Sequence, residues 1–289
     1  MTSATEQSKT PAGRRGPAVP RLIATDLDGT LLREDKTVSA RTLAALAAAE
    51  EAGIEVFFVT GRPARWMDVV SDHVHGHGLA ICANGAAVVD LHDGGRCVEV
   101  RPLERAAALA IVRAVRAAAP DASFAVERTT CFQYEPQYPP YNLAPDAVMA
   151  PAETLLAEDG GRAAPILKLL AHHPELAPDA FLELARSVAG EHGSFTHSSS
   201  TALLEISGVG VSKASTLARC CAARGIAPRE VVAFGDMPND LEMLGWAGTS
   251  YAMANAHPDV LAATTHRTAA NDEDGVAEVV ERILRDGTL

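Results

Sequence analysis

The sequence has few of the features that mark secreted, zinc-binding or membrane proteins. Its 289 residues include only five cysteines, an odd number, and no two of them have C-x-x-C spacing. They do not indicate a disulfide framework or a zinc site, and are typical of small buried side chains in a reducing compartment. No apolar run approaches the length of a membrane-spanning helix. We therefore expect a cytoplasmic protein that does not enter a membrane.

Positive charge is also scarce. The chain has 25 basic and 37 acidic residues, which gives a formal net charge of −12. This balance opposes binding to nucleic acid or to an anionic membrane surface. An anionic small-molecule substrate would therefore need cations gathered at its own site. The apolar fraction of 47% is ample for a sizeable core.

Short apolar runs alternate with helical segments in the first and last parts of the chain. Strands are predicted at residues 22–24, 54–59 and 79–82, and a helix capped by Ser39 lies between the first two. This order predicts a parallel, right-handed open sheet of the α/β class. The pattern resumes with a helix over residues 213–224, strands at 231–234 and 249–252, and a terminal helix over 275–286.

The middle of the chain has a different pattern. Residues 88–90 and 97–100 flank a turn and predict a hairpin, and further strands and two helices follow up to residue 206. We expect this block to be an inserted α+β domain. The predicted organisation is a flexible N-terminal tail over residues 1–20, a Rossmann-like parallel-sheet core over 20–85 and 205–289, and the inserted domain over 86–204.

Two carboxylates follow the first predicted strand. Asp26 and Asp28 should lie at a crevice, because buried parallel strands carry functional residues at their carboxyl ends. Two nearby anionic side chains repel each other unless a cation or a proton separates them. A divalent ion held by Asp26, with Asp28 free to exchange a proton, would remove that conflict. An acidic turn without catalytic function is the alternative.

Other polar residues follow strands or begin helices on the same side of the predicted sheet. Taken in chain order, four motifs resemble those of the haloacid dehalogenase-like (HAD) superfamily. The similarity is to its Cof-type, class IIB branch, which carries a cap domain between the second and third motifs. The motifs are Asp-Leu-Asp-Gly-Thr from residue 26, Val-Thr-Gly-Arg from 59, Val-Ser-Lys from 211 and Gly-Asp-Met-Pro-Asn-Asp from 235.

The resemblance implies a role for each charged residue of the first, third and fourth motifs. Asp26, Asp236 and the backbone carbonyl of Asp28 would hold Mg²⁺, an ion that prefers oxygen ligands. Asp26 would be the nucleophile and form an aspartyl-phosphate, and Asp28 would be the acid/base, its pKa tuned by a crowded anionic pocket. Lys213 would bind the phosphate at a helix N-terminus. Asp240 would support the metal or orient Lys213.

The remaining implied contacts are with the phosphate or the substrate. Thr60 would donate its hydroxyl to the phosphoryl group, and Gly61 and Arg62 would lie beside it. Arg62 could equally form a structural ion pair. Asn239 would contact the phosphate or the rest of the substrate. Taken singly, Thr60 could be only a helix cap and Lys213 only a solvated helix start.

The implied function is a Mg²⁺-dependent phosphatase that hydrolyses phosphate monoesters of small metabolites, with sugar phosphates expected. A phosphomutase or phosphotransferase could use the same nucleophile. A phosphometabolite-binding regulator without turnover is a further alternative, although binding alone does not need Asp28. Haloalkanoate dehalogenation is disfavoured by the same residue. The sequence does not indicate an oligomeric state.

Three further candidates carry weaker signals. His73, His75 and His77 could bind a transition metal but are more typical of surface histidines in a loop. The segment 134–141, with Arg128 and Gln133, could line the specificity surface of the cap or pack inside it. Lys168 could point at the active site, but periodicity does not assign its face.

Overall fold

The expected parallel strands form one sheet in the computed structural model, which describes residues 20–71, 78–140, 146–157, 164–197 and 203–287. The order of this eight-stranded sheet is β14-β13-β12-β1-β2-β3-β4-β5. Strand β1 (Leu22–Thr25) lies between β2 (Glu55–Val59) and β12 (Val231–Gly235), and pairs with both in parallel. The other strands are β3 (Leu79–Cys82), β4 (Ala87–Asp90), β5 (Arg96–Val100), β13 (Thr249–Ala252) and β14 (His266–Arg267).

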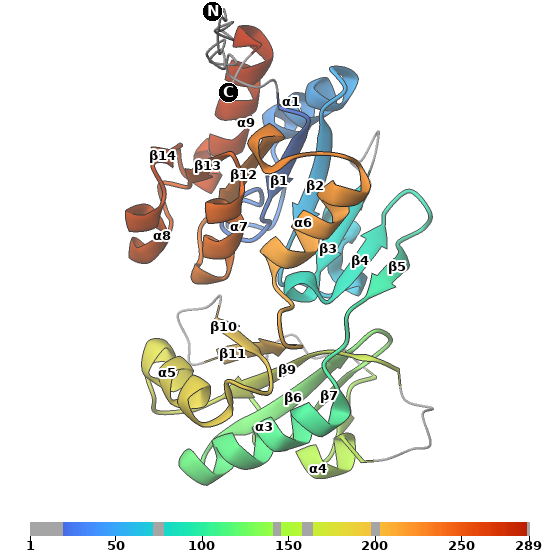
Figure 1. The fold of residues 1–289 in the computed structure, drawn as a ribbon, viewed down its shortest axis with the longest axis vertical. Helices are drawn as coiled ribbons and strands as arrows, with labels where there is room; N and C mark the ends of the chain where they lie inside the picture. Colours follow the sequence, from blue (N-terminus) through green and yellow to red (C-terminus); the bar gives the residue numbers. More distant parts are fainter. Residues whose placement is uncertain (1–19, 72–77, 141–145, 158–163, 198–202, 288–289) are drawn as a thin grey trace, which may run out of the picture.

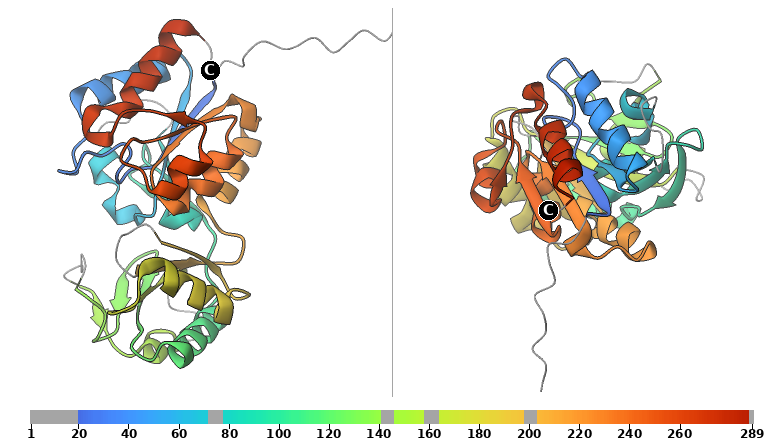
Figure 2. Two further views of the ribbon diagram at one scale, coloured as in Figure 1. Left: turned by 90° about the vertical axis from the view of Figure 1, so that its left-hand side faces the viewer. Right: turned by 90° about the horizontal axis from the view of Figure 1, so that it is seen from above.

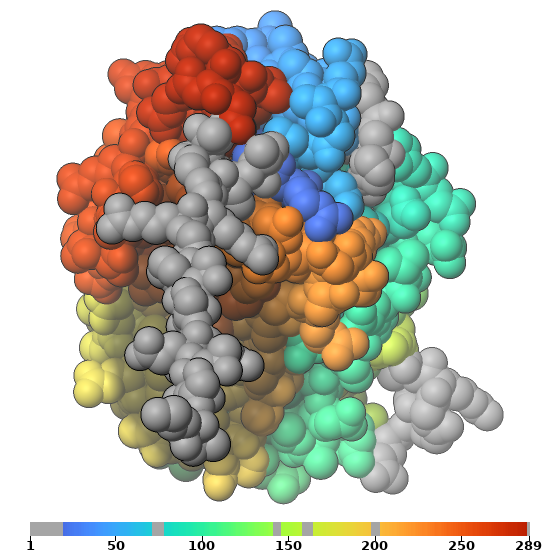
Figure 3. All heavy atoms as spheres, turned by 45° about the horizontal axis from the view of Figure 1, so that its top comes forward, coloured from blue at the N-terminus to red at the C-terminus, as the bar shows by residue number. Residues whose placement is uncertain are grey.

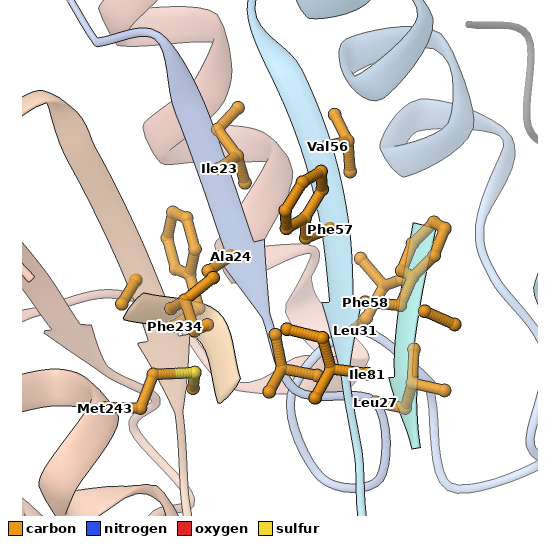
Figure 4. Packing of buried hydrophobic residues seen from close by; sticks show 14 of the residues in the cluster. Ile23, Ala24, Leu27, Leu31, Val56, Phe57, Phe58, Ile81, Phe234 and Met243 are labelled. Atoms are coloured by element: carbon orange, nitrogen blue, oxygen red, sulfur yellow. The ribbon is translucent and has the colours of Figure 1, made fainter. Parts of the chain in front are cut away.

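The central strands are mostly apolar because helices cover both faces of the sheet. All four residues of β1 are fully buried, and the rings of Phe57 and Phe234 pack beside Ile23 (Figure 4). Helices α1 (Ala40–Glu51) and α9 (Gly275–Asp286) lie side by side on one face (Figures 2 and 3). The other helices here are α2 (Asp68–Ser71), α6 (Lys213–Ala223), α7 (Leu241–Trp246) and α8 (Pro258–Ala263), with single 3₁₀ turns η1 (Ala64–Trp66), η2 (Ala83–Gly85), η3 (Pro228–Glu230), η4 (Pro238–Asp240) and η5 (Asn271–Glu273).

Local signals set the ends of these helices. The Ser39 hydroxyl accepts a hydrogen bond from the Thr42 amide at 3.0 Å and caps α1, and Gly53 follows the helix with φ of +81°. Only glycine adopts that conformation without strain, which is why the helix stops there. The α/β class predicted from the sequence is confirmed.

A second, six-stranded sheet lies apart from the first (Figure 1), in the order β10-β11-β9-β6-β7-β8. Helices α3 (Arg105–Ala118) and α5 (Pro178–Ala189) pack together on one of its faces, over an apolar cluster that includes Leu169 and Ala171. Residues alternate between the faces of a strand, so Lys168 lies on the opposite face, toward the first sheet. The elements are β6 (Ser123–Arg128), β7 (Phe132–Tyr134), β8 (Val148–Met149), β9 (Ile166–His172), β10 (Ser194–His197), β11 (Leu203–Ser207) and the short helix α4 (Ala152–Leu155).

The expected boundaries of the inserted domain, at residues 86 and 204, do not coincide with the sheets. The predicted hairpin of β4 and β5 forms, but β4 pairs antiparallel with β3, so the hairpin extends the first sheet. The chain crosses between Arg101, whose amide donates to Ala86, and Leu103, whose amide donates to Ile166. Strand β11, which spans the expected second boundary, belongs to the second sheet. We therefore propose an inserted domain, called the cap below, over residues 102–207.

Two groups of residues singled out in the sequence lie outside the described part of the chain. These are the tail up to residue 19 and the histidines at 73, 75 and 77. Tyr141 also lies outside the described part of the chain. The sequence analysis predicted no strands in residues 129–150, where β7 and β8 form. Among the described helices, none combines the length and the apolar character that crossing a membrane requires.

Candidate active site

A buried lysine between two carboxylates forms the centre of the site. Lys213 Nζ lies 2.6 Å from Asp26 Oδ1 and 2.7 Å from Asp240 Oδ1, and only 1% of the lysine is exposed. Asp26 directly follows β1, and Lys213 begins α6, where Ser212 caps the helix by accepting the Ser215 amide at 3.2 Å. The strand end and the helix start thus bring together residues that are 187 positions apart.

Asp240 also holds the loop that carries Asp236. Its Oδ2 atom accepts hydrogen bonds from the amides of Asp236 and Met237, both at 3.1 Å. Asp240 therefore both positions Lys213 and fixes this turn. Thr30 donates its hydroxyl to Asp236 Oδ1 at 2.8 Å, so the loop after β1 and the loop after β12 are joined.

Three carboxylates of the site could share a metal ion. Oxygen atoms of Asp26, Asp236 and Asp240 lie within 4.8 Å of one another. Burial, followed by the charge of Asp240, raises the pKa of Asp236 to about 7. Burial also raises the pKa of Asp26, although Lys213 opposes this effect. Three carboxylates around one ammonium leave two negative charges uncompensated, and a hard divalent ion such as Mg²⁺ fits both that charge and the oxygen donors.

The side chain of Asp28 forms ion pairs with two other cations. Arg62 binds it through two hydrogen bonds, Nε to Oδ2 at 2.6 Å and a guanidinium NH₂ group to Oδ1 at 2.7 Å, and Lys36 Nζ lies 3.0 Å from Oδ1. Partial burial opposes ionisation of Asp28, but Arg62 and then Lys36 outweigh it and lower its pKa. The pKa of Asp28 is thus set by two cations in direct contact with it, Lys36 at 8 positions and Arg62 at 34 positions along the chain, and not by surrounding anions as expected.

The loop after β2 is tied to the loop after β3. Thr60 Oγ1 accepts the Arg62 amide at 3.0 Å, and the Thr60 carbonyl accepts the Asn84 amide at 3.0 Å. Asn84 has φ of 54°, a left-handed conformation that asparagine tolerates better than most residues. Its side-chain oxygen accepts Asn239 Nδ2 at 3.1 Å. Asn84 is thus a site residue to which the sequence analysis gave no role, although Asn84-Gly85-Ala86 resembles a recurrent stretch of the same family branch.

The cap reaches this loop through two side chains. Lys168 Nζ donates to the carbonyl of Gly61 at 2.8 Å and lies 2.6 Å from Glu205 Oε2. Glu205 in turn accepts Asn84 Nδ2 at 2.6 Å. Lys168 therefore faces the loop of the second motif, which periodicity alone did not assign, and Glu205 was not singled out.

The other cap candidates contribute to packing. Arg128 donates to Gln133 Oε1 at 2.9 Å and to the backbone carbonyls of Ala164 and Leu155. Tyr138 is buried in a small apolar cluster with Phe132, Ala125 and Leu170. Among the described residues of that segment, these contacts favour packing inside the cap over a specificity surface.

Comparisons with known proteins identify the family. The model of the haloacid dehalogenase-like hydrolases matches residues 23–280, and the chain belongs to this family, in its Cof-type branch. It is 30% identical over 273 residues to the pyridoxal phosphate phosphatase YbhA of Escherichia coli, covering 90% of this chain and 97% of the relative. It is 29% identical over 277 residues to the 5-amino-6-(5-phospho-D-ribitylamino)uracil phosphatase YitU of Bacillus subtilis, covering 91% and 97%.

Solved structures agree with the fold. A haloacid dehalogenase-like hydrolase from Bacteroides thetaiotaomicron is 25% identical, with a TM-score of 0.71 over 91% of this chain and 99% of that one. A HAD subclass IIB sugar phosphatase is 19% identical, with a TM-score of 0.76 over 93% of this chain and 100% of that one. The family model and the relatives named as phosphatases show that the protein is an enzyme, a hydrolase of phosphate monoesters.

Proposed function

We propose that this enzyme is a Mg²⁺-dependent phosphatase of small phosphorylated metabolites and that it acts through an aspartyl-phosphate on Asp26. The observation that carries the proposal is the placement of Asp26, buried at the tip of β1 with the Lys213 ammonium 2.6 Å away. A carboxylate approaches an anionic phosphoryl group only where positive charge compensates the repulsion. Lys213 supplies that charge in an otherwise acidic protein.

The reaction has two steps. An Asp26 oxygen forms a bond to phosphorus while the bond from phosphorus to the ester oxygen breaks, and Asp28 gives a proton to the departing alcohol. Water then attacks the aspartyl-phosphate, Asp28 takes its proton, and inorganic phosphate leaves. A Mg²⁺ ion held by Asp26, Asp236 and the Asp28 carbonyl would neutralise phosphate charge.

Arg62 and Thr60 complete the phosphate site in this proposal. The ion pair with Arg62 favours ionised Asp28, the form that the hydrolytic step needs. We propose that Arg62 turns toward the phosphate when substrate binds, which leaves Asp28 able to hold the proton for the first step. Thr60 would donate its hydroxyl hydrogen to a phosphoryl oxygen, and Gly61 provides a backbone carbonyl that Lys168 fixes.

Sugar phosphates are the substrates we propose. The support is the class of the relatives, which include phosphatases of a ribitylamino-uracil phosphate and of pyridoxal phosphate. The five free cysteines fit a reducing compartment, and we place the reaction in the cytoplasm.

The test measures phosphate release from a panel of sugar phosphates, with Mg²⁺ and with a chelator, for the wild type and Asp26→Asn. We expect metal-dependent release that the variant loses, while the exposed control Asp121→Asn keeps it. Acid quenching of a single turnover should trap phosphate covalently on the wild type only. Transfer of the phosphoryl group to a second sugar, without free phosphate, would instead establish a phosphotransferase. Binding without turnover by well-folded, metal-loaded wild type would refute the phosphatase.

A further inference from the structure

A loop outside the four motifs joins the loops after β1 and β12, which carry the proposed Mg²⁺ ligands. It comprises residues 253–257, between β13 and α8. The His257 amide donates a hydrogen bond to the carbonyl of Asp236 at 2.8 Å. Asn255 Nδ2 donates to the carbonyl of Gly29, also at 2.8 Å. This short loop therefore contacts the backbone of both ligand-carrying loops.

Asn255 makes two hydrogen bonds with backbone groups that are distant from it in sequence or belong to another loop. Besides donating to Gly29, it accepts the amide of Asn271 with Oδ1 at 3.1 Å. A backbone carbonyl only accepts and a backbone amide only donates, so these partners fix the orientation of the side-chain amide. Asn255 is itself exposed, and water could pair with its amide equally well. The contacts are therefore not needed to pair a buried group, and their effect is to restrain the backbone of Gly29.

Gly29 is a position where such a restraint matters. Glycine has the widest choice of backbone conformations, and Gly29 has φ of +79°. Its φ and ψ set the relative direction of two carbonyls, its own and that of Asp28, which is a proposed Mg²⁺ ligand. The backbone also lies against a second proposed ligand, because a Cβ on Gly29 would lie 2.2 Å from Asp236 Oδ2. Holding Gly29 therefore restrains one ligand and its distance from another.

We propose that Asn255 is a positioning residue of the metal site, which holds the Gly29 carbonyl and so keeps the Asp28 carbonyl directed at the bound ion. It acts through the backbone and contacts neither the ion nor the substrate. The inference rests on the proposed Mg²⁺-dependent phosphatase function and adds a residue to its metal site. Removing a group that orients a metal ligand typically weakens metal binding by about 10- to 100-fold. Asn255 acts through one backbone hydrogen bond, so we expect an effect at the lower end of this range.

The test measures the dissociation constant of Mg²⁺ by titration calorimetry on metal-free protein, a readout that does not depend on turnover. Asn255→Ala should raise this constant about tenfold. The Tm of the metal-free protein should change little, because the side chain is exposed. In phosphate release from the sugar phosphate panel, the Mg²⁺ concentration that gives half-maximal activity should rise by the same factor. Saturating Mg²⁺ should restore most of kcat.

Asn271→Ala is the matched control. Asn271 also donates its Nδ2 atom to a carbonyl of the loop after β1, that of Leu32 at 2.9 Å, but it is buried. The control should therefore lower the Tm of the metal-free protein more than Asn255→Ala does. It keeps the backbone amide that Asn255 accepts and the bond to Gly29, so its dissociation constant for Mg²⁺ should stay close to that of the wild type.

A second substitution separates the hydrogen bonds from the volume of the side chain. Asn255→Leu keeps the branched shape and loses both hydrogen bonds, so it should weaken Mg²⁺ binding as Asn255→Ala does. A wild-type dissociation constant in Asn255→Leu would assign the effect to lost volume and overturn the inference. The same holds for a wild-type constant in Asn255→Ala. Equal increases in Asn255→Ala and Asn271→Ala would also overturn it, because they would show a general loosening of the loop.

Failure of the phosphatase function gives a different result. In that case the wild type binds Mg²⁺, and binding weakens in Asn255→Ala, but no phosphate is released from any sugar phosphate of the panel. A wild type that binds no Mg²⁺ would overturn both the metal dependence of the proposed function and the role of Asn255.

Discussion

Replacing Lys213 with methionine should make the stability of the enzyme depend strongly on pH. The substitution keeps the length of the side chain and removes the ammonium that lies 2.6 and 2.7 Å from Asp26 and Asp240. Both carboxylates are almost fully buried. Breaking a buried ion pair by removing one partner costs about 3–5 kcal/mol, because the remaining charge is left uncompensated. We expect a loss of that size in the metal-free protein at pH 8.

The loss should shrink in acid. Burial already raises the pKa of Asp26 in the folded protein, and Lys213 is the main group that opposes this. Without it the folded state binds more protons than the unfolded state, so the free energy of unfolding falls as pH rises. Conversely, protonation of Asp26 as the pH falls removes the uncompensated charge and restores stability.

Urea denaturation of metal-free wild type and Lys213→Met at pH 5 and pH 8 measures both effects. Lys36→Met is the matched control, since Lys36 also pairs with an acid of the site but its side chain is 58% exposed. An exposed pair contributes at most about 1 kcal/mol, so this variant should stay close to wild type. An equal loss for Lys213→Met at both pH values would refute the electrostatic reasoning and leave only a packing effect.

Two further predictions concern the metal site and its closest backbone approach. Stabilisation by Mg²⁺, measured as a shift in Tm, should grow as the pH rises from 5 to 8. Burial and Asp240 raise the pKa of Asp236 to about 7, and below that value protons compete with the ion for this carboxylate. A Tm shift that does not depend on pH would contradict this prediction. Gly29→Ala should abolish metal-dependent phosphate release and destabilise the fold, because φ is +79° and the added Cβ would lie 2.2 Å from Asp236 Oδ2. The control is Gly94→Ala, which is also at positive φ but has open space around it. It should lower the free energy of unfolding by only about 1–2 kcal/mol and keep activity. Similar effects in both variants would exclude a role for the contact with Asp236.

Local physics explains why much of the fold could be predicted. A buried parallel strand requires a continuous apolar run, and residues 22–24 and 231–234 show one. Helix α1 needs a cap and a stop, which Ser39 and Gly53 supply. The carboxyl ends of parallel strands meet at one edge of the sheet, so polar residues placed there could be expected to share a site.

Pairing between distant segments was not predictable in the same way. The hairpin of β4 and β5 was visible as a hairpin, but its attachment to β3 rather than to the cap depends on hydrogen bonds that no local pattern encodes. The same holds for β7 and β8, which are too short for a periodic signal.

The sequence by itself determined the family, the parallel-sheet core and the residues gathered around Asp26, because these depend on short motifs and on apolar periodicity. Only the tertiary structure decided how those residues are charged and held. It brought Arg62 and Lys36 onto Asp28, and these two cations lower the pKa of that carboxyl, which the sequence analysis expected surrounding anions to tune. It also turned Lys168 and Glu205 of the cap toward Gly61 and Asn84, since the face that a side chain occupies depends on strand register and domain packing.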